Sequence, residues 1–208
     1  MANNQGHNAN KNGASYEKLV NGIMFHKFGK NYEIKNRCFA KSGKVVYCEL
    51  FKDGHLLCKY SSQEGFTNIF LKRCEISVNM KKEPDGAFYF PDENRIIILE
   101  IKKQASSGSV NEKLGLGAFL RDYPYKRILK KLDCKRDIVY ILDEFFESDD
   151  NQDYFDYMND NNILYHFGDT FPLEMVGLEE VIKSTPDELE KVREYVNGCY
   201  DNPIYDLF

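Results

Sequence analysis

The sequence predicts a single α/β domain with a mixed central β-sheet flanked by helices. Apolar residues at helical spacing indicate a first helix that ends near Gly29. A strand-rich stretch follows from Val45 to about Val78, and helix and strand alternate from about Val110 onward. Consecutive strands favour antiparallel pairing, whereas alternation with helices favours parallel pairing, so the sheet should contain both. A chain of 208 residues can bury a substantial core in one domain.

The N-terminal region divides into a polar segment and the first helix. Residues 1–13 are rich in Asn, Gly and Gln and lack the basic-then-apolar pattern of a signal peptide. We expect them to form a flexible tail and residues 14–208 to form the domain. The apolar face of the helix should pack on the sheet, and it consists of Tyr16, Leu19, Val20, Ile23, Met24 and Phe28.

The first predicted hairpin turns at Asp53-Gly54, a dipeptide typical of two-residue hairpin loops. With that loop Cys48 opposes Lys59, and Cys58 lies on the other face of the sheet. This arrangement disfavours a zinc site made of Cys38, Cys48, His55 and Cys58. The six cysteines include no C-x-x-C pair, so reduced thiols are the default expectation.

A second hairpin carries the most informative residues of the chain. Turn residues at 91–94 separate the strand Ala87–Phe90 from a strand that starts at Arg95. If these four residues form the loop, Asp85 lies opposite Glu100, with the two Cβ atoms about 4.5–5.5 Å apart. Two carboxylates at that separation repel unless a cation lies between them. Glu100 and Lys102 share one face of the strand, so the pattern predicts a metal site.

The rest of the chain completes the α/β pattern. A basic helix is expected from about Val110, interrupted at Pro124 and resuming through Leu132. A capping box at Thr185 with Pro186 at the first helical position predicts the last helix. Gly198 is expected to end that helix. Two short buried strands are predicted before it, at Ile138–Leu142 and at Ile163–Phe167.

These motifs resemble the PD-(D/E)xK nuclease superfamily, in particular type II restriction endonucleases. Pro84-Asp85 and Glu100-Ile101-Lys102 match the hallmark residues, on a strand–turn–strand context. Glu17 occupies a helix where many members carry an accessory acidic residue. The segment that follows is also similar to a group of restriction-type endonucleases, through Gln104, Gly108-Ser109 and Glu112-Lys113-Leu114. The resemblance implies a restriction-endonuclease-like fold.

The resemblance also implies a role for each site residue. Asp85 and Glu100 would hold one or two Mg²⁺ ions, which favour carboxylates together with phosphate oxygens. Lys102 would place a positive charge near the attacking water or the phosphorus. Gln104 would line the same face, and Glu17 would orient Lys102 or join the outer shell of a metal.

Each motif has a purely structural alternative. Pro84-Asp85-Gly86 is a common turn, and Glu100-Ile101-Lys102 fits the solvated end of a buried strand. Ser109 and Glu112 are fully explained by a capping box that opens a helix. The metal-site interpretation is favoured because the opposition of Asp85 and Glu100 otherwise has no rationale.

The charge of the chain is strongly segregated. The net charge is −5, but residues 1–136 hold 25 of the 28 Lys and Arg residues and 14 of the 33 Asp and Glu residues. A local basic surface after the predicted site suits phosphate binding, although a solvated helix face would look the same. The candidate nucleic-acid-binding residues are Lys103, Ser109, Lys113, Arg121, Lys126 and Arg127.

Together these observations predict a Mg²⁺-dependent phosphodiester hydrolase that cuts double-stranded DNA. A type II restriction enzyme acting as a cytoplasmic homodimer is the first expectation, with no nucleotide cofactor and no membrane segment. The alternatives are a structure-selective, phage or repair nuclease, or a non-catalytic nucleic-acid-binding module of the same fold. An interaction protein that uses its acidic C-terminal part is a further alternative.

Overall fold

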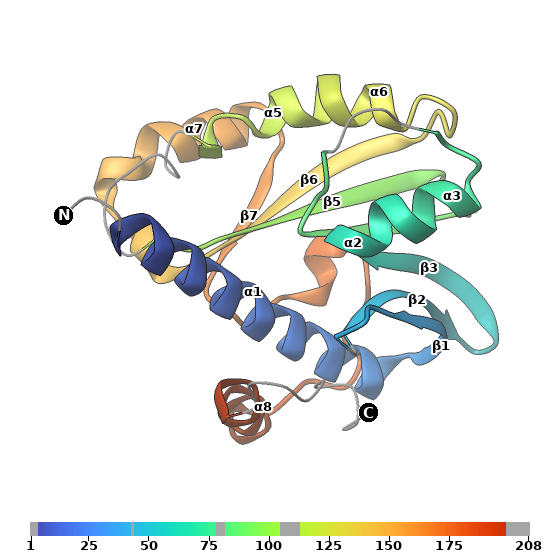
Figure 1. Ribbon diagram of the computed structural model, residues 1–208, viewed down its shortest axis with the longest axis horizontal. Coiled ribbons are helices and arrows are strands. Elements are labelled where there is room, and N and C mark those ends of the chain that lie inside the picture. The colour runs from blue at the N-terminus through green and yellow to red at the C-terminus, as the bar shows by residue number, and fades with distance from the viewer. Residues whose placement is uncertain (1–3, 43, 78–81, 105–112, 199–208) are drawn as a thin grey trace.

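The computed structural model describes residues 4–42, 44–77, 82–104 and 113–198, with side chains described from Ser15 onward. Within these residues seven strands form one sheet in sequence order (Figure 1). They are β1 (Glu33–Phe39), β2 (Val45–Lys52), β3 (His55–Ser62), β4 (Gly86–Phe90), β5 (Arg95–Lys102), β6 (Lys135–Leu142) and β7 (Leu164–Phe167). Neighbours from β1 to β5 pair antiparallel, whereas β5, β6 and β7 pair parallel. The predicted α/β class with a mixed sheet is confirmed.

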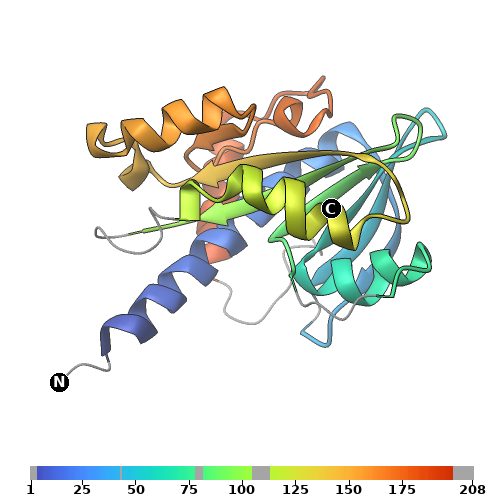
Figure 2. The same cartoon turned by 90° about the horizontal axis from the view of Figure 1, so that it is seen from above.

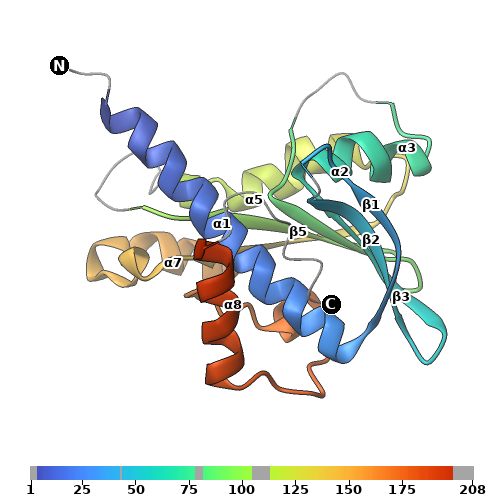
Figure 3. The same cartoon turned by 60° about the horizontal axis from the view of Figure 1, so that its bottom comes forward.

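Helices cover both faces of the sheet. One face carries α1 (Asn4–Asn31), and α8 (Pro186–Gly198) crosses the outer side of α1 (Figure 3). A short helical turn, η5 (Leu173–Val176), packs on the same face as α1. The opposite face carries α2 (Gln63–Gly65), η1 (Phe66–Phe70), α3 (Leu71–Arg73), α5 (Gly117–Leu120), η2 (Arg121–Tyr125), α6 (Lys126–Ile128) and α7 (Gln152–Asp160). Two further turns, η3 (Glu144–Glu147) and η4 (Asp149–Asn151), follow β6. None of the described helices is both long and apolar enough to cross a bilayer.

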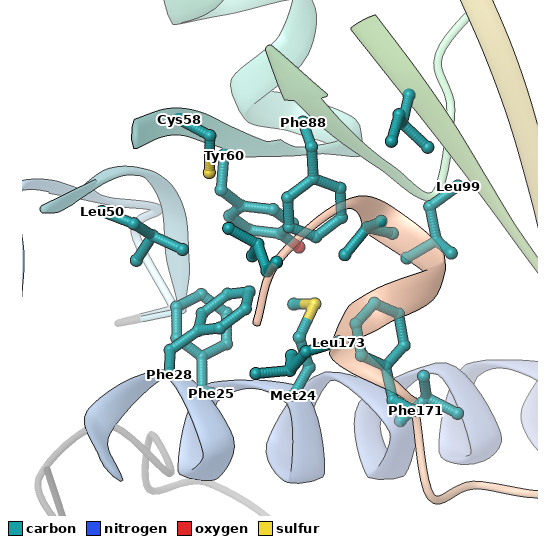
Figure 4. Packing of buried hydrophobic residues seen from close by; sticks show 14 of the residues in the cluster. Met24, Phe25, Phe28, Leu50, Cys58, Tyr60, Phe88, Leu99, Phe171 and Leu173 are labelled. Atoms are coloured by element: carbon teal, nitrogen blue, oxygen red, sulfur yellow. The ribbon is translucent and has the colours of Figure 1, made fainter. Parts of the chain in front are cut away.

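The sheet separates two hydrophobic cores. On the α1 face, Met24, Phe25 and Phe28 point toward Tyr60 and Phe88 (Figure 4). These aromatic rings meet mostly edge-to-face, an arrangement that adds to the stabilisation from apolar burial. The second core lies on the other face and includes Tyr47, Phe66, Phe70, Ile98, Tyr125 and Tyr140. Because side chains alternate along a strand, successive residues of β5 belong to opposite cores.

The hairpin of β4 and β5 has the predicted turn and register. Phe90 pairs with Arg95, and the pairing continues to Gly86 opposite Leu99. The turn closes through a hydrogen bond in which the Asn94 amide donates to the Pro91 carbonyl over 3.1 Å. Asn94 has a φ of 45°, a left-handed conformation that asparagine tolerates better than most residues. Asp85 therefore directly precedes the first paired residue of β4.

The segment after β3 is helical, so the expectation of a strand-rich stretch extending to Val78 was wrong. Phe66 and Phe70 stack one helical turn apart, with ring centroids 5.6 Å apart, and both are buried. Gly65 explains how closely this segment packs, because a Cβ atom there would lie 1.6 Å from the Val46 carbonyl oxygen. Tertiary packing of aromatic residues thus overrides their strand propensity.

The register of β2 and β3 differs from the prediction beyond the turn. Asp53 and Gly54 both have positive φ, as the predicted two-residue turn requires. An irregularity between Leu50 and Phe51 then shifts the pairing by one residue, so that Cys48 opposes Tyr60. Cys58 consequently lies in the same core as Cys48, not on the other face. A bulge of this kind leaves no clear trace in the sequence.

Helix ends also depart from the predictions. Helix α1 already begins at Asn4, within the segment expected to be a tail, and it continues past Gly29 to Asn31. Nothing in the Asn- and Gly-rich composition explains the N-terminal extension. Pro124 lies inside the π-helical turn η2 and does not interrupt the helix, which ends at Ile128.

The capping box of the last helix is confirmed. The Thr185 amide donates to Glu188 Oε2 over 2.7 Å, and the Glu188 amide donates to Thr185 Oγ1 over 3.3 Å. These reciprocal hydrogen bonds satisfy two of the backbone groups at the start of α8.

Candidate active site

Asp85, Glu100 and Lys102 meet where β4 begins and β5 ends. Lys102 Nζ lies 2.8 Å from Asp85 Oδ2 and 2.8 Å from Glu100 Oε2. The hairpin register brings the two carboxylates together, and the alternation of side chains puts Glu100 and Lys102 on one face. The Lys102 ammonium is thus a cation shared by the two acidic groups that the sequence predicted to oppose each other.

Asp85 is held by the backbone of the neighbouring strand. The Ile101 amide donates a hydrogen bond to Asp85 Oδ2 over 2.7 Å. The next residue, Gly86, packs tightly, since a Cβ atom there would lie 3.2 Å from a methyl carbon of Leu99 and 3.3 Å from the Tyr60 ring. The Asp85 side chain keeps 18% of its surface exposed, so the carboxylate is fixed and still reachable from solvent.

Glu100 is more deeply buried, and a tyrosine binds it from the covering helical segment. Its side chain is 6% exposed, and Tyr125 donates a hydrogen bond from its hydroxyl to Glu100 Oε1 over 3.1 Å. Burial, reinforced by the negative charge of Glu100, raises the pKa of Tyr125. The phenol therefore stays protonated and acts as a donor. The two oxygens of Glu100 have different partners, Tyr125 on one side and Lys102 on the other.

Lys102 is charged at neutral pH in this setting. Burial acts to lower the pKa of its ammonium, but the charges of Glu100 and Asp85 and the hydrogen bonds to them outweigh burial. The pKa of Lys102 consequently lies above its ordinary value. Two acidic groups share one ammonium, so the formal charges of the three residues sum to minus one.

The donor set fits a hard divalent cation better than a zinc ion. In the part of the chain that the structure describes, no three His, Cys, Asp or Glu side chains form a metal-binding group. Structural zinc usually needs four such ligands, whereas Mg²⁺ is commonly held by one or two carboxylates together with water and substrate phosphate. Asp85 and Glu100 could supply two such carboxylates, and the formal negative charge of the cluster favours a cation.

Two other predicted catalytic residues have different surroundings. Gln104 is buried two residues beyond Lys102, and its backbone amide faces the Asp143 carboxylate at 3.3 Å. Burial raises the pKa of Asp143. The Glu17 carboxylate instead pairs with Lys44 at 3.2 Å. Lys102 donates its side-chain hydrogen bonds to Asp85 and Glu100, and the predicted contact between Glu17 and Lys102 is not among them.

The predicted nucleic-acid-binding residues are spread over two faces of the molecule. Lys103 lies over the Tyr16 ring on the α1 face, where it lines a cavity of about 710 Å³ with Asp143 and Arg193. Its side chain is therefore on the opposite side of the sheet from Lys102. Arg121 binds Asp122 and the Asn161 carbonyl. The remaining candidates are Lys113, Lys126 and Arg127, which are exposed, and Ser109, which lies outside the described residues.

A second buried carboxylate, Glu49 on β2, resembles Glu100 in several respects. Tyr47 donates a hydrogen bond from its hydroxyl to Glu49 Oε1 over 2.7 Å, and Asn36 donates to the other oxygen. Arg73 pairs with Glu49 at 3.5 Å and lies over the Tyr47 ring. Burial acts to raise the pKa of Glu49, but these hydrogen bonds and the charges of Lys59 and Arg73 outweigh it, so the pKa is lowered.

Sequence reasoning missed Tyr125 as a partner of Glu100. Its helical spacing with Ala118 and Ile128 predicts that it faces the core, as it does, but no local pattern indicates which side chain its hydroxyl meets. Comparisons with protein-family models, curated proteins and solved structures find no match to this chain. The interpretation of the site therefore depends on its geometry and on the resemblance of its motif.

Proposed function

We propose that this protein is a Mg²⁺-dependent DNA endonuclease with a restriction-endonuclease-like fold. The observation that carries the proposal is the pair of carboxylates, Asp85 and Glu100, bridged by Lys102 at 2.8 Å from each. An ordinary strand end or turn does not need two buried or half-buried acids sharing one ammonium. The arrangement is what a metal-dependent phosphodiesterase requires, namely ligands for a cation and a positive charge beside them.

Each residue has a chemical role in this proposal. Asp85 and Glu100 would hold Mg²⁺, which when bound would polarise the scissile phosphate and lower the pKa of a water molecule. Lys102 would stabilise negative charge that develops on the phosphate oxygens. The Ile101 amide fixes the Asp85 carboxylate, and the Tyr125 hydroxyl fixes that of Glu100, so neither carboxylate has to reorganise.

Two forms of the nuclease follow from different observations. The resemblance of the motif supports a type II restriction enzyme that cuts double-stranded DNA as a homodimer. The alternative is a structure-selective nuclease, and it is favoured by an exposed pair of stacked aromatic rings, Phe119 and Tyr123, on the helical segment that carries Tyr125.

Digestion of a long DNA of known sequence tests the proposal. The purified protein is incubated with Mg²⁺ or with EDTA, alongside Lys102→Ala and the control Lys52→Ala, whose lysine forms a surface pair with Glu179. We expect Mg²⁺-dependent cutting that is lost in EDTA and falls on the order of 10²–10³-fold in Lys102→Ala, because one preorganised charge is removed. Lys52→Ala should cut like the wild type.

The products distinguish the two forms of the nuclease. Discrete bands would support the restriction enzyme, and cutting confined to forks, flaps or gaps would support the structure-selective form. Melting temperatures of both variants verify that they are folded. Absence of cutting on all of these DNAs, or equal cutting by Lys102→Ala, contradicts the proposal.

A further inference from the structure

The helical segment that contacts Glu100 has a second, outward face. Leu114, Ala118, Tyr125 and Ile128 are buried against the sheet. On the other side Leu116, Phe119 and Tyr123 are 45%, 51% and 67% exposed. Figure 2 shows this segment, α5 to α6, lying over the sheet on the side away from α1. The same segment thus fixes Glu100 with one face and presents apolar and aromatic side chains to solvent with the other.

The two exposed rings are already arranged as a stack. The centroids of Phe119 and Tyr123 lie 5.3 Å apart, and the ring planes differ by 24°. Tyr123 belongs to the π-helical turn η2, a departure from regular helix that is frequent at functional sites. Exposed large apolar side chains scattered singly are ordinary, but a contiguous apolar face commonly marks a binding surface.

Within the helical segment itself, residues 113–130, the exposed charges are mostly positive. Exposed basic side chains flank the rings on both sides along the helical segment, and they are Lys113, Lys126, Arg127 and Lys130. The acidic residue among the rings, Asp122, is paired with Arg121 at 2.8 Å. We use the term aromatic stripe for Lys113, Leu116, Phe119, Tyr123, Lys126, Arg127 and Lys130. Aromatic rings between phosphate-binding cations are the recurring composition of surfaces that bind single strands.

We propose that the aromatic stripe binds an unpaired DNA strand, with bases stacked on Phe119 and Tyr123 and phosphates on the flanking lysines and Arg127. This inference rests on the proposed nuclease function, and it makes the substrate a duplex with a single-stranded arm. Charge complementarity selects this occupant over a second copy of the chain. A symmetric dimer contact would pair the stripe with itself and bring its basic groups together.

Binding of labelled DNA in EDTA tests this inference without cutting. The probes are a duplex with a tail of thymidines and the same duplex with blunt ends, and the readout is fluorescence anisotropy. The wild type should bind the tailed duplex more tightly. The double variant Phe119→Ala/Tyr123→Ala should lose about 30-fold or more in affinity for the tailed duplex, since stacking on each of the two rings is worth about 1–3 kcal/mol per base. Blunt-duplex affinity should be unchanged.

Two further variants make the result specific to the stripe and to stacking. Phe39→Ala removes another exposed phenylalanine, 54% exposed on β1, and should bind like the wild type. Phe119→Leu/Tyr123→Leu keeps apolar surface without aromatic rings and should bind as weakly as the alanine variant. Lys126→Gln should reduce the dependence of log affinity on log salt by about 0.7, the value expected for one phosphate contact on a single strand.

The outcomes separate this inference from the proposed function. If the protein cuts DNA but the tail gives no advantage, or the alanine variant binds the tail normally, the inference fails while the nuclease proposal stands. If the tail is bound through Phe119 and Tyr123 but no DNA is cut, the nuclease proposal fails and the stripe remains a single-strand surface. Full binding by the leucine variant, or dimers of the wild type that dissociate in the alanine variant, would overturn the inference in favour of an apolar protein contact.

Discussion

Glu100 and Glu49 show which features distinguish a candidate catalytic carboxylate from a structural one. Both lie on interior strands, both are largely buried, and both accept a hydrogen bond from a tyrosine hydroxyl. Each also pairs with a basic side chain, Lys102 for Glu100 and Arg73 for Glu49. Burial, a tyrosine partner and an ion pair are therefore not enough to identify an active site.

The two sites differ in their charge balance. Glu49 is one acid faced by two basic residues, Arg73 and Lys59, and one of its oxygens accepts a hydrogen bond from Asn36. Glu100 shares Lys102 with a second acid, Asp85, so one negative charge is left over. A buried carboxylate whose charge and hydrogen bonds are matched needs no further cation, whereas an excess carboxylate at a partly exposed position favours binding of one. The lesson is to count charges around a buried acid before assigning it a role.

The largest expected effect is a loss of DNA cutting on substitution of Asp85 that substitution of Glu49 does not cause. Asp85→Asn removes the excess charge and should lower Mg²⁺-dependent cutting by more than about 100-fold, since loss of a direct ligand should exceed the effect of losing an outer-shell partner. Glu49→Gln should cut at the wild-type rate. Initial cutting rates at saturating Mg²⁺ and DNA give the comparison, and equal losses in both variants would remove the distinction between the sites.

A smaller effect on the cutting rate is expected when the tyrosine that binds Glu100 is replaced. Tyr125→Phe removes the donor that fixes Glu100 Oε1 and should slow cutting about tenfold, in the range found for outer-shell partners of metal ligands. The matched variant Tyr47→Phe removes the donor to Glu49 and should leave cutting unchanged. Rates measured across Mg²⁺ concentrations test this, and an unchanged Tyr125→Phe rate would show that Glu100 needs no such support.

The smallest expected effect is a pH-dependent loss of folding stability on substitution of Glu49. Glu49→Gln leaves donors facing an amide and should lower the free energy of unfolding by about 1 kcal/mol at pH 7. Because the folded-state pKa of Glu49 is lowered, its stabilising contribution is present above the unfolded-state pKa and is lost as the pH falls through the folded-state pKa. Denaturant unfolding of both proteins from pH 7 to below pH 4 should show the difference shrinking. A constant difference would show that the Glu49 charge does not contribute.

The sequence predicted the proximity of Asp85, Glu100 and Lys102 better than it predicted the packing around them. The turn at Pro91–Asn94 and the alternation along β5 are local, so they were enough to bring Asp85, Glu100 and Lys102 together. Tyr125 could not be assigned to Glu100 because that contact depends on how the helical segment crosses the sheet. The bulge at Leu50 and the helix around Phe66 and Phe70 were likewise decided by packing between elements distant in sequence.

Titration of the DNA-free protein with Mg²⁺ tests the central claim most directly, with binding heat and melting temperature as readouts. The wild type and Glu49→Gln should both bind Mg²⁺ saturably and melt at higher temperature as the ion is added, because ligand that binds only the folded state stabilises it by mass action. Asp85→Asn and Glu100→Gln should lose that response. Equal Mg²⁺ responses in the wild type and these two variants would contradict the assignment of Asp85 and Glu100 as the metal-binding pair.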